Sequence, residues 1–220
     1  MKENMIKDTE ELYHFIFKFY KNIYKQFSLK NDVIPSIVPK TLRDYYLNIG
    51  NLSTIMPSKD NNFKAPLNTQ DCLIPPHKLE YEGDLLIISW ENQGNWSCGI
   101  KIGEGDNPNI YSDSGELLGE SQGYEDMGYP LDKFLITLTL QETVMSAKYL
   151  YNTSFDGNIE KILKAPITKL WSKGRTAFDE DTHTFYLSGD NIILMEYEGL
   201  WLASNQVFDE SIFSVDMTKI

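Results

Sequence analysis

Hydrophobic residues recur at three- and four-residue steps in three segments of the chain, a spacing that places them on one face of an α-helix. The first segment covers about residues 8–28, and Asp8 with Glu11 forms a capping box at its start. The second covers about residues 39–50, and the third, which is the longest, begins at Pro130. We therefore predict three amphipathic helices.

Residues 84–102 carry the pattern of a β-hairpin: a short apolar run, an Asn-Gln-Gly turn at 92–94 and an alternating segment after it. We predict that this hairpin lies at the centre of a sheet, with Leu86 and Ile88 on one buried face. Further strand patterns, of which the last three form a meander, occur at 110–112, 184–187, 192–197 and 200–203.

The segment between about residues 51 and 80 is rich in Asn, Ser, Asp and Pro and has no periodicity, so we expect a surface excursion that holds one helical turn. Elsewhere, helical patterns lie on either side of strands that are joined by hairpins rather than by long crossovers. This order favours an α+β fold. With 220 residues, 41% of them hydrophobic, the chain is long enough for one domain with its own core.

Acidic residues outnumber basic ones by 32 to 20, which gives a formal charge of −12. This balance argues against nucleic acid or an anionic membrane surface as the partner, because binding to either requires clustered Lys and Arg. It permits a basic protein as the partner. The alternative is that the acidic residues only keep the protein in solution.

Charged residues near the N-terminus occupy positions where a signal peptide would need an apolar run, and no segment approaches the ~20 apolar residues of a membrane span. Cys72 and Cys98 are distant in sequence and fit no metal-ligand spacing, so we expect free thiols. These features predict a cytoplasmic protein without a membrane partner.

Motifs for nucleophilic or metal catalysis are nearly absent from the sequence, in which the three histidines are far apart. Asp179, Glu180 and Asp181 form a cluster that, with His183 nearby, could hold a divalent cation. The cluster lacks the spacing of a calcium loop, so a solvated turn is favoured. Glu91 could supply one carboxylate for acid–base catalysis, but nothing in the sequence names a second. We predict no metal, no cofactor and no catalytic residue.

Residues 86–100 hold an apolar strand, Glu-Asn-Gln-Gly, an aromatic residue, then Gly and an aliphatic residue. This pattern resembles the central hairpin of the SUKH superfamily, and three further segments resemble that superfamily in the right order. Residues 37–50 look like its proline-started helix, residues 107–111 like its proline-containing strand and residues 131–145 like its long Phe-Leu helix. The resemblance covers about residues 34–150, and more weakly the strand meander that follows.

The resemblance implies a single mixed, mostly antiparallel, curved sheet flanked by helices, without a catalytic site. We expect one domain over residues 1–220, with the family core at about 34–150 and the meander at about 184–204. Bacterial proteins of this family commonly act as immunity proteins that neutralise toxins, many of them nucleases. The expected function is therefore non-enzymatic binding of a basic toxin domain. The alternatives are an intracellular scaffold or regulator with an endogenous partner and, less favoured, a hydrolase.

Turns between the predicted strands present acidic and aromatic side chains that a partner could contact. Trp90 and Trp96 flank the hairpin turn; we expect them to pack in the core, with exposed anchoring as the alternative. Trp171, Trp201 and Phe178 are also expected in the core. The residues predicted to contact a partner are Glu91, Asn92, Trp96, Asp113, Glu116, Glu125 and Asp126.

Overall fold

The computed structural model describes residues 5–20, 23, 26–53, 66–115, 123–154, 159–176 and 182–220. Its α-helices are α1 (Thr9–Tyr20), α2 (Lys40–Ile49) and α4 (Leu131–Met145). Its short 3-10 turns are η1 (Asn31–Val33), η2 (Gly50–Ser53), η3 (Pro76–Lys78), η4 (Ile159–Lys161) and η5 (Glu210–Ile212). The three predicted helices are confirmed, but the end predicted for the first is wrong: α1 ends at Tyr20, and residues 26–28, which were predicted to be helical, are described as non-helical. No helix in these ranges is long and apolar enough to cross a membrane.

The start of α1 has the predicted capping interactions. The backbone N–H of Glu11 donates to Asp8 Oδ1 at 3.0 Å, and the backbone N–H of Lys7 donates to Glu11 Oε2 at 2.6 Å. The two side chains thus satisfy amide groups that have no partner within the helix.

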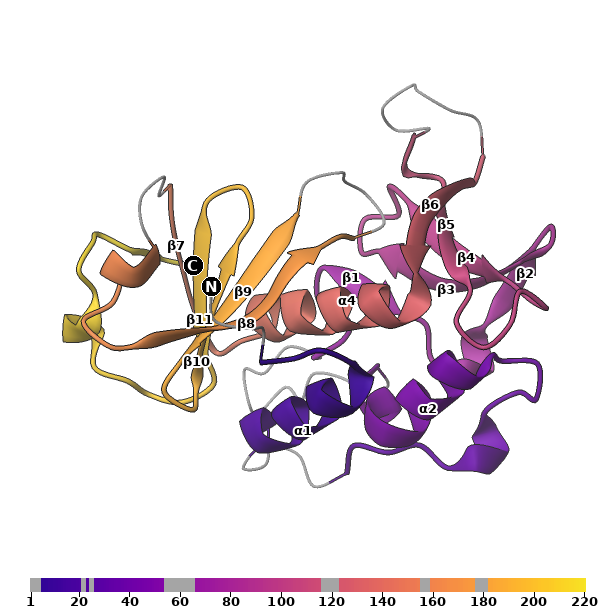
Figure 1. Cartoon of the computed structure of the whole chain (residues 1–220), viewed down its shortest axis with the longest axis horizontal. Coiled ribbons are helices and arrows are strands. Elements are labelled where there is room, and N and C mark those ends of the chain that lie inside the picture. The colour runs from indigo at the N-terminus through magenta and orange to yellow at the C-terminus, as the bar shows by residue number, and fades with distance from the viewer. Residues whose placement is uncertain are drawn as a thin grey trace.

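The strands form two antiparallel sheets (Figure 1). Sheet A consists of β1 (Asp71–Leu73), β2 (Glu80–Glu82), β3 (Leu85–Glu91), β4 (Ser97–Lys101), β5 (Asn109–Ser112) and β6 (Glu125–Pro130). Sheet B consists of β7 (Tyr149–Thr153), β8 (Ile167–Gly174), β9 (His183–Ser188), β10 (Ile192–Glu196), β11 (Leu200–Ser204) and β12 (Thr218–Lys219). The strand order is β1-β3-β4-β5-β6 in sheet A, with β2 also beside β3, and β12-β7-β11-β10-β9-β8 in sheet B. The α+β class is confirmed, whereas the prediction of a single mixed sheet is wrong.

The reason for two sheets is the position of α4, which lies between them (Figure 1). On one side α4 contacts β5 and β6 of sheet A, and on the other it contacts β8, β10 and β11 of sheet B. Every residue from Phe134 to Val144 is buried. A helix that is covered on all sides needs partners on all sides, and each sheet supplies one of them.

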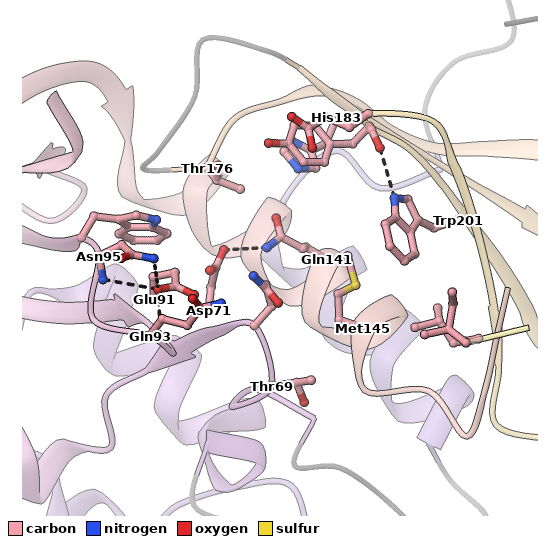
Figure 2. Close-up of a pocket in the computed structure, with 16 residues that line it drawn as sticks. Thr69, Asp71, Glu91, Gln93, Asn95, Gln141, Met145, Thr176, His183 and Trp201 are labelled. Carbon is pink, nitrogen blue, oxygen red and sulfur yellow. Dashed lines mark hydrogen bonds between the residues drawn. The ribbon is translucent and has the colours of Figure 1, made fainter. Parts of the chain in front are cut away.

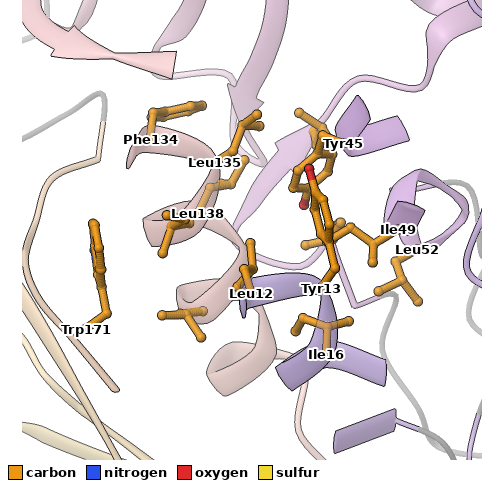
Figure 3. Close-up of a cluster of buried hydrophobic side chains, with 14 of the residues drawn as sticks. Leu12, Tyr13, Ile16, Tyr45, Ile49, Leu52, Phe134, Leu135, Leu138 and Trp171 are labelled. Atoms are coloured by element: carbon orange, nitrogen blue, oxygen red, sulfur yellow. The ribbon is translucent and has the colours of Figure 1, made fainter. Parts of the chain in front are cut away.

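The main core fills the space between α4, α1 and α2 (Figure 3). Two of its buried tyrosines have hydrogen-bond partners: the Tyr45 hydroxyl lies 2.7 Å from Thr139 Oγ1, and the Tyr46 hydroxyl donates to the carbonyl of Ile74 at 2.5 Å. Satisfied hydroxyls make these large rings compatible with a dry interior. The second bond also ties α2 to the loop after β1.

A β-bulge in β3 reverses the alternation of the central hairpin. Leu86 and Ile88 lie in the main core, as predicted. The pairing with β4 shifts register in the residues before Ser89, which is also fully buried. The side chains of Ile88 and Ser89 thus both face inward. After Ser89, each side chain of β3 lies on the face opposite to the one that strict alternation predicts. Trp90 is therefore 39% exposed, while Glu91 is only 6% exposed.

The five tryptophan and phenylalanine predictions have different outcomes. The prediction that Trp90 packs in the core is wrong, because the bulge turns this side chain outward. Trp96 and Trp171 are buried, as predicted, and Trp201 is half-buried against the same core. Phe178 lies outside the described residues.

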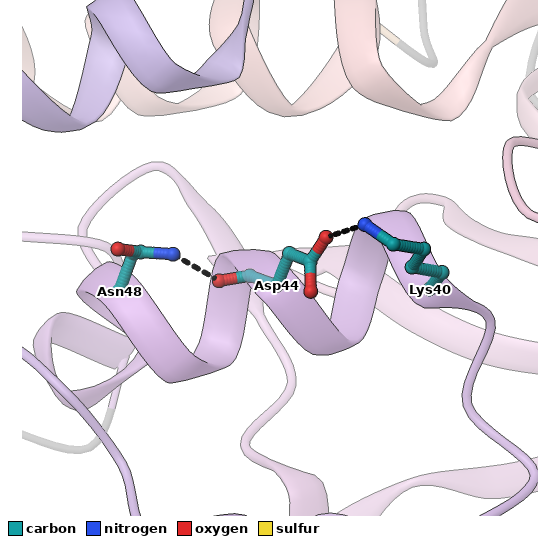
Figure 4. A network of polar contacts seen from close by, with 3 residues as sticks. All are labelled: Lys40, Asp44 and Asn48. Atoms are coloured by element: carbon teal, nitrogen blue, oxygen red, sulfur yellow. Dashed lines mark hydrogen bonds and ion pairs between the residues drawn. The ribbon is translucent and has the colours of Figure 1, made fainter.

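The exposed side of α2 carries a short polar network (Figure 4). Lys40 Nζ forms an ion pair with Asp44 one turn further along the helix, and Asn48 Nδ2 donates to the carbonyl of Asp44 at 2.8 Å. Both side chains of the ion pair are solvent-exposed. Such a pair contributes little to stability, so we expect a substitution that breaks it to be nearly neutral.

Both cysteines are free thiols, as predicted, and both are buried. Burial and, to a smaller extent, the nearby Glu142 carboxyl together raise the pKa of the Cys72 thiol to about 11. Since the thiolate is the reactive form of cysteine, Cys72 is unreactive near neutral pH.

Candidate functional site

A cleft of about 520 Å³ opens between the two sheets, beside the C-terminal half of α4 (Figure 2). Sheet A contributes the start of β1 and the turn between β3 and β4, and sheet B contributes β11 and the start of β9. The lining residues are Thr69, Gln70, Asp71, Glu91, Gln93, Asn95, Trp96, Gln141, Met145, Leu150, Thr176, His183, Tyr197, Glu198, Trp201 and Ile220.

The floor of the cleft is anchored by Glu142, a fully buried residue of α4. Its carboxyl group accepts hydrogen bonds from three successive backbone N–H groups: those of Thr69 at 2.7 Å, Gln70 at 3.1 Å and Asp71 at 2.9 Å. Burial, and then the Asp71 carboxyl, raise the pKa of Glu142 to about 8, whereas the backbone N–H groups lower it. The three bonds fix the chain that enters β1 and place Asp71 at the cleft.

Asp71 is 4% exposed and accepts a hydrogen bond of 2.6 Å from Gln141 Nε2. It stands directly opposite Glu91 in the antiparallel pairing of β1 with β3. Side chains opposite each other in such a pair point to the same face. Burial, and to a smaller extent the charge of Glu91, raise the pKa of Asp71 to about 7. The structure therefore supplies the second carboxylate that the sequence could not name.

The Glu91 side chain stabilises the hairpin turn that follows it. Its Oε2 atom accepts hydrogen bonds from the backbone N–H groups of Gln93 at 2.8 Å and Asn95 at 3.3 Å, and from Asn95 Nδ2 at 3.1 Å. Gly94 has a φ of 75°, which favours glycine at this position. One carboxylate oxygen of Glu91 thus has a structural role, while the side chain lines the cleft.

The opposite wall of the cleft is aromatic. The ring of His183, which is fully buried, stacks on Tyr197 with 3.9 Å between the centroids and 14° between the planes. Trp201 Nε1 donates to the Tyr197 carbonyl at 3.2 Å and holds the turn between β10 and β11 (Figure 2). Trp96 comes from the sheet A side. The cleft thus combines carboxyl and amide groups and the Trp96 ring on the sheet A side with the rings of His183, Tyr197 and Trp201 on the sheet B side.

The seven residues predicted to contact a partner fall into two groups. Glu91 and Trp96 line the cleft, although both are largely buried. Asn92 is exposed, but its Nδ2 donates to the carbonyl of Thr69 at 2.6 Å, and its backbone N–H donates to the carbonyl of Gln70 at 2.9 Å. These two bonds join the hairpin turn to the segment before β1, which gives Asn92 a structural role.

The other predicted residues lie away from the cleft. Asp126 and Glu125 are exposed on β6, the edge strand of sheet A. Asp113, after β5, accepts from the backbone N–H of Ser97 at 2.6 Å and from its hydroxyl at 2.9 Å. Glu116 lies outside the described residues. The structure thus does not bring all the predicted acidic residues together on one face.

Asp113 and Asp126 belong instead to the face of sheet A that points away from α4, which we call the outer face. Its centre is a small apolar cluster of Ile74, Leu85 and Ile87, with Leu79, Tyr111 and Tyr124 packed against it. Trp90 points to the same side. It is paired with Ser97 of β4, and the Ser97 hydroxyl lies 2.5 Å from the hydroxyl of Tyr124 on the outer face. Acidic residues on or beside this face are Glu80, Glu82, Asp84, Glu104, Asp113 and Asp126.

The tyrosines of the outer face are held by these acidic groups. The Tyr124 hydroxyl donates to Glu82 Oε2 at 2.9 Å, and the Tyr111 hydroxyl donates to Glu104 Oε1 at 3.4 Å. Lys101 Nζ lies 4.5 Å from the centroid of the Tyr111 ring and 3.7 Å from Asp84. The outer face is therefore a tyrosine-rich surface with an acidic rim.

Sequence reasoning missed Asp71 and Gln141 as site residues. Asp71 lies in the segment 51–80, which we expected to be a surface excursion. That expectation is wrong for β1, which is buried. Residues 54–65 lie outside the described part. One helical turn was expected, and the described residues of this segment hold η3 as well as the end of η2. The one available signal was Glu142, a polar residue within the apolar pattern of the third predicted helix.

The predicted alternative of a cation site at Asp179, Glu180 and Asp181 falls outside the described residues. His183, the fourth member, is buried at the cleft. Within the described ranges no group of three or more His, Cys, Asp or Glu side chains is arranged to hold a metal ion. The absence of a cofactor stays a prediction.

Comparisons of the chain with protein-family models, with curated proteins and with solved structures find no match. The resemblance to the SUKH superfamily accordingly stays a prediction that rests on the four sequence segments.

Proposed function

We propose that this protein is a non-enzymatic binding domain of the SUKH type, and that it neutralises a basic toxin domain by direct contact through the outer face of sheet A. The observation that carries the proposal is the composition of that face: exposed or half-exposed Trp90, Tyr111 and Tyr124 with an acidic rim. Trp and Tyr are enriched among the residues that dominate binding energy at protein interfaces.

Charge supports a basic partner. The chain carries a formal charge of −12, and Lys101 on the outer face is already paired with Asp84. An acidic rim accelerates encounter with a cationic surface, while the aromatic centre determines how slowly the complex separates. A toxin that acts on nucleic acid needs a cationic substrate-binding surface. The charge of such a surface is complementary to that of the acidic rim.

The test is the association rate with the polypeptide encoded by the neighbouring reading frame, for the wild type and for the double variant Glu82→Lys with Asp126→Lys. We expect charge reversal to lower the association rate about tenfold or more at low salt, with a smaller difference at high salt. The matched control reverses two exposed acidic residues elsewhere, Asp32→Lys with Asp216→Lys, and should leave the rate near that of the wild type.

Trp90→Ala tests the aromatic part separately. Because this side chain is 39% exposed, its removal should not unfold the protein, but we expect the dissociation rate to rise about thirtyfold, as for an interface anchor. Rates unchanged in both Trp90→Ala and the charge-reversed variant would place the interface elsewhere. A neighbouring frame that encodes a housekeeping protein, bound with equal affinity, would favour the endogenous-partner alternative.

A further inference from the structure

The cleft between the sheets contains acceptor oxygens without donors. The amide of Gln141 projects from α4 into the cleft, with its nitrogen directed at Asp71 (Figure 2). Its oxygen, Oε1, is buried and accepts no hydrogen bond among the residues that the structure describes, and the whole side chain is only 6% exposed. A buried acceptor of this kind is costly unless a donor reaches it.

Two carboxylate oxygens stand beside it. The hydrogen bond to Asp71 uses Oδ2, and all the hydrogen bonds to Glu91 use Oε2. Within the described part of the chain, Asp71 Oδ1 and Glu91 Oε1 accept none. Asp71 and Glu91 are direct cross-strand neighbours, and Gln141 touches Asp71, so the three oxygens belong to one wall of the cleft.

The lining carries acidic groups without a balancing cation. Its carboxyl groups are Asp71, Glu91 and Glu198, and no Lys or Arg occurs among the described residues that line the cleft. Carboxylates held out of water favour a positively charged neighbour. The facing wall offers the rings of Tyr197 and Trp201, whose electron-rich faces attract a cation.

From these features we infer that the cleft binds a guanidinium or primary ammonium group, which donates to Asp71, Glu91 and Gln141 and packs against the aromatic wall. Both groups are cations that only donate hydrogen bonds, and the guanidinium presents five donors in one plane. A neutral polar ligand would satisfy the acceptors but leave the carboxylates without a countercharge. The group could belong to a free small molecule or to an Arg or Lys side chain of a polypeptide.

This site does not depend on the proposed toxin binding, because the outer face lies on the opposite side of sheet A. Loss of binding in the cleft and loss of binding at the outer face can therefore be measured independently.

The experiment is calorimetric titration of the full chain with three probes at about pH 8, which lies above the raised pKa of Asp71, so that this carboxyl group is mostly ionised. The probes are agmatine, the peptide acetyl-Gly-Arg-Gly-amide and the same peptide with citrulline, the neutral isostere of arginine. We expect at least one guanidinium probe to bind with 1:1 stoichiometry, about tenfold or more tightly than the citrulline peptide. Tighter binding of agmatine indicates a free small cation as the source, and tighter binding of the arginine peptide indicates a side chain.

Two variants locate the binding. Asp71→Asn keeps an acceptor for Gln141 but removes the charge, and we expect about a tenfold loss of affinity for the preferred probe. Glu80→Gln removes an exposed charge on β2, away from the cleft, and should bind like the wild type.

The pH dependence adds a second readout. Asp71 faces Glu91 from β3 and Glu142 from α4, while His183 and Glu198 line the opposite side. Because burial raises the pKa of Asp71 to about 7, affinity should increase as the pH rises from about 6 to about 8 in the wild type, and this increase should be reduced in Asp71→Asn. Equal binding of the arginine and citrulline peptides, no binding of either guanidinium probe, or unchanged affinity in a folded Asp71→Asn would each overturn the inference.

Discussion

Glu142→Gln is expected to lower the free energy of unfolding by about 3 kcal/mol, the largest loss that we predict for a substitution of nearly equal volume. The Glu142 carboxyl group accepts three backbone N–H bonds from Thr69, Gln70 and Asp71 inside the protein. A glutamine amide retains one acceptor oxygen and turns an NH₂ group toward N–H donors. At least one buried backbone donor then has no acceptor.

The measurement is urea denaturation at neutral pH, with Lys40→Ala as the reference. That variant breaks an ion pair on the exposed side of α2 and should change the free energy of unfolding by less than about 0.5 kcal/mol (Figure 4). If Glu142→Gln lowered the free energy of unfolding as little as Lys40→Ala, the Glu142 carboxyl group would not stabilise the segment before β1.

The second prediction is that the wild type loses stability as the pH rises from about 5.5 to about 8.5, and that Asp71→Asn loses less. Burial raises the pKa of Asp71 to about 7 and that of Glu142 to about 8, both well above their ordinary values. Across this range the folded protein therefore holds more protons than the unfolded chain. The free energy of unfolding must then fall as the pH rises, in contrast to a carboxylate with a lowered pKa.

Asp71→Asn isolates one of the two groups. Asparagine retains an acceptor for Gln141 and does not titrate, so we expect the free energy of unfolding of Asp71→Asn to rise relative to that of the wild type, on the order of 2 kcal/mol between about pH 5.5 and about pH 8.5. Asp216→Asn removes the same charge at an exposed position and controls for the overall negative charge. Parallel pH profiles for the wild type and Asp71→Asn would show that the Asp71 carboxyl group titrates as it does in the unfolded chain.

The helices and the central hairpin could be predicted because their signals are local. The three- and four-residue periodicity that produces α1 also determines which of its side chains are buried, and the Asp8–Glu11 cap depends on residues within one turn. The Asn-Gln-Gly sequence is sufficient for a tight turn with a positive φ at Gly94. The fold class followed from the order of these elements.

The number of sheets could not be predicted in this way. The pattern of α4 shows that it is apolar, but not whether one sheet curves around it or two sheets enclose it. That choice depends on how strands distant in sequence divide its surface, with β5 and β6 on one side and β8, β10 and β11 on the other. Pairing between distant strands leaves no local trace in the sequence.

At the candidate site, too, some features could be predicted from the sequence and others could not. By itself, the sequence determined that Glu91 lies at the end of a buried strand and that Glu142 interrupts an apolar helix. Only the tertiary structure decided that Glu91 and Glu142 both face the inner side of sheet A. The bulge before Ser89 reverses the alternation of β3 and turns Glu91 inward. Strand β1 then brings Asp71 between Glu91 and Glu142. Alternation depends on each residue's own position, whereas a bulge depends on the strand paired beside it, so a shift of one residue exposed Trp90 and buried Glu91.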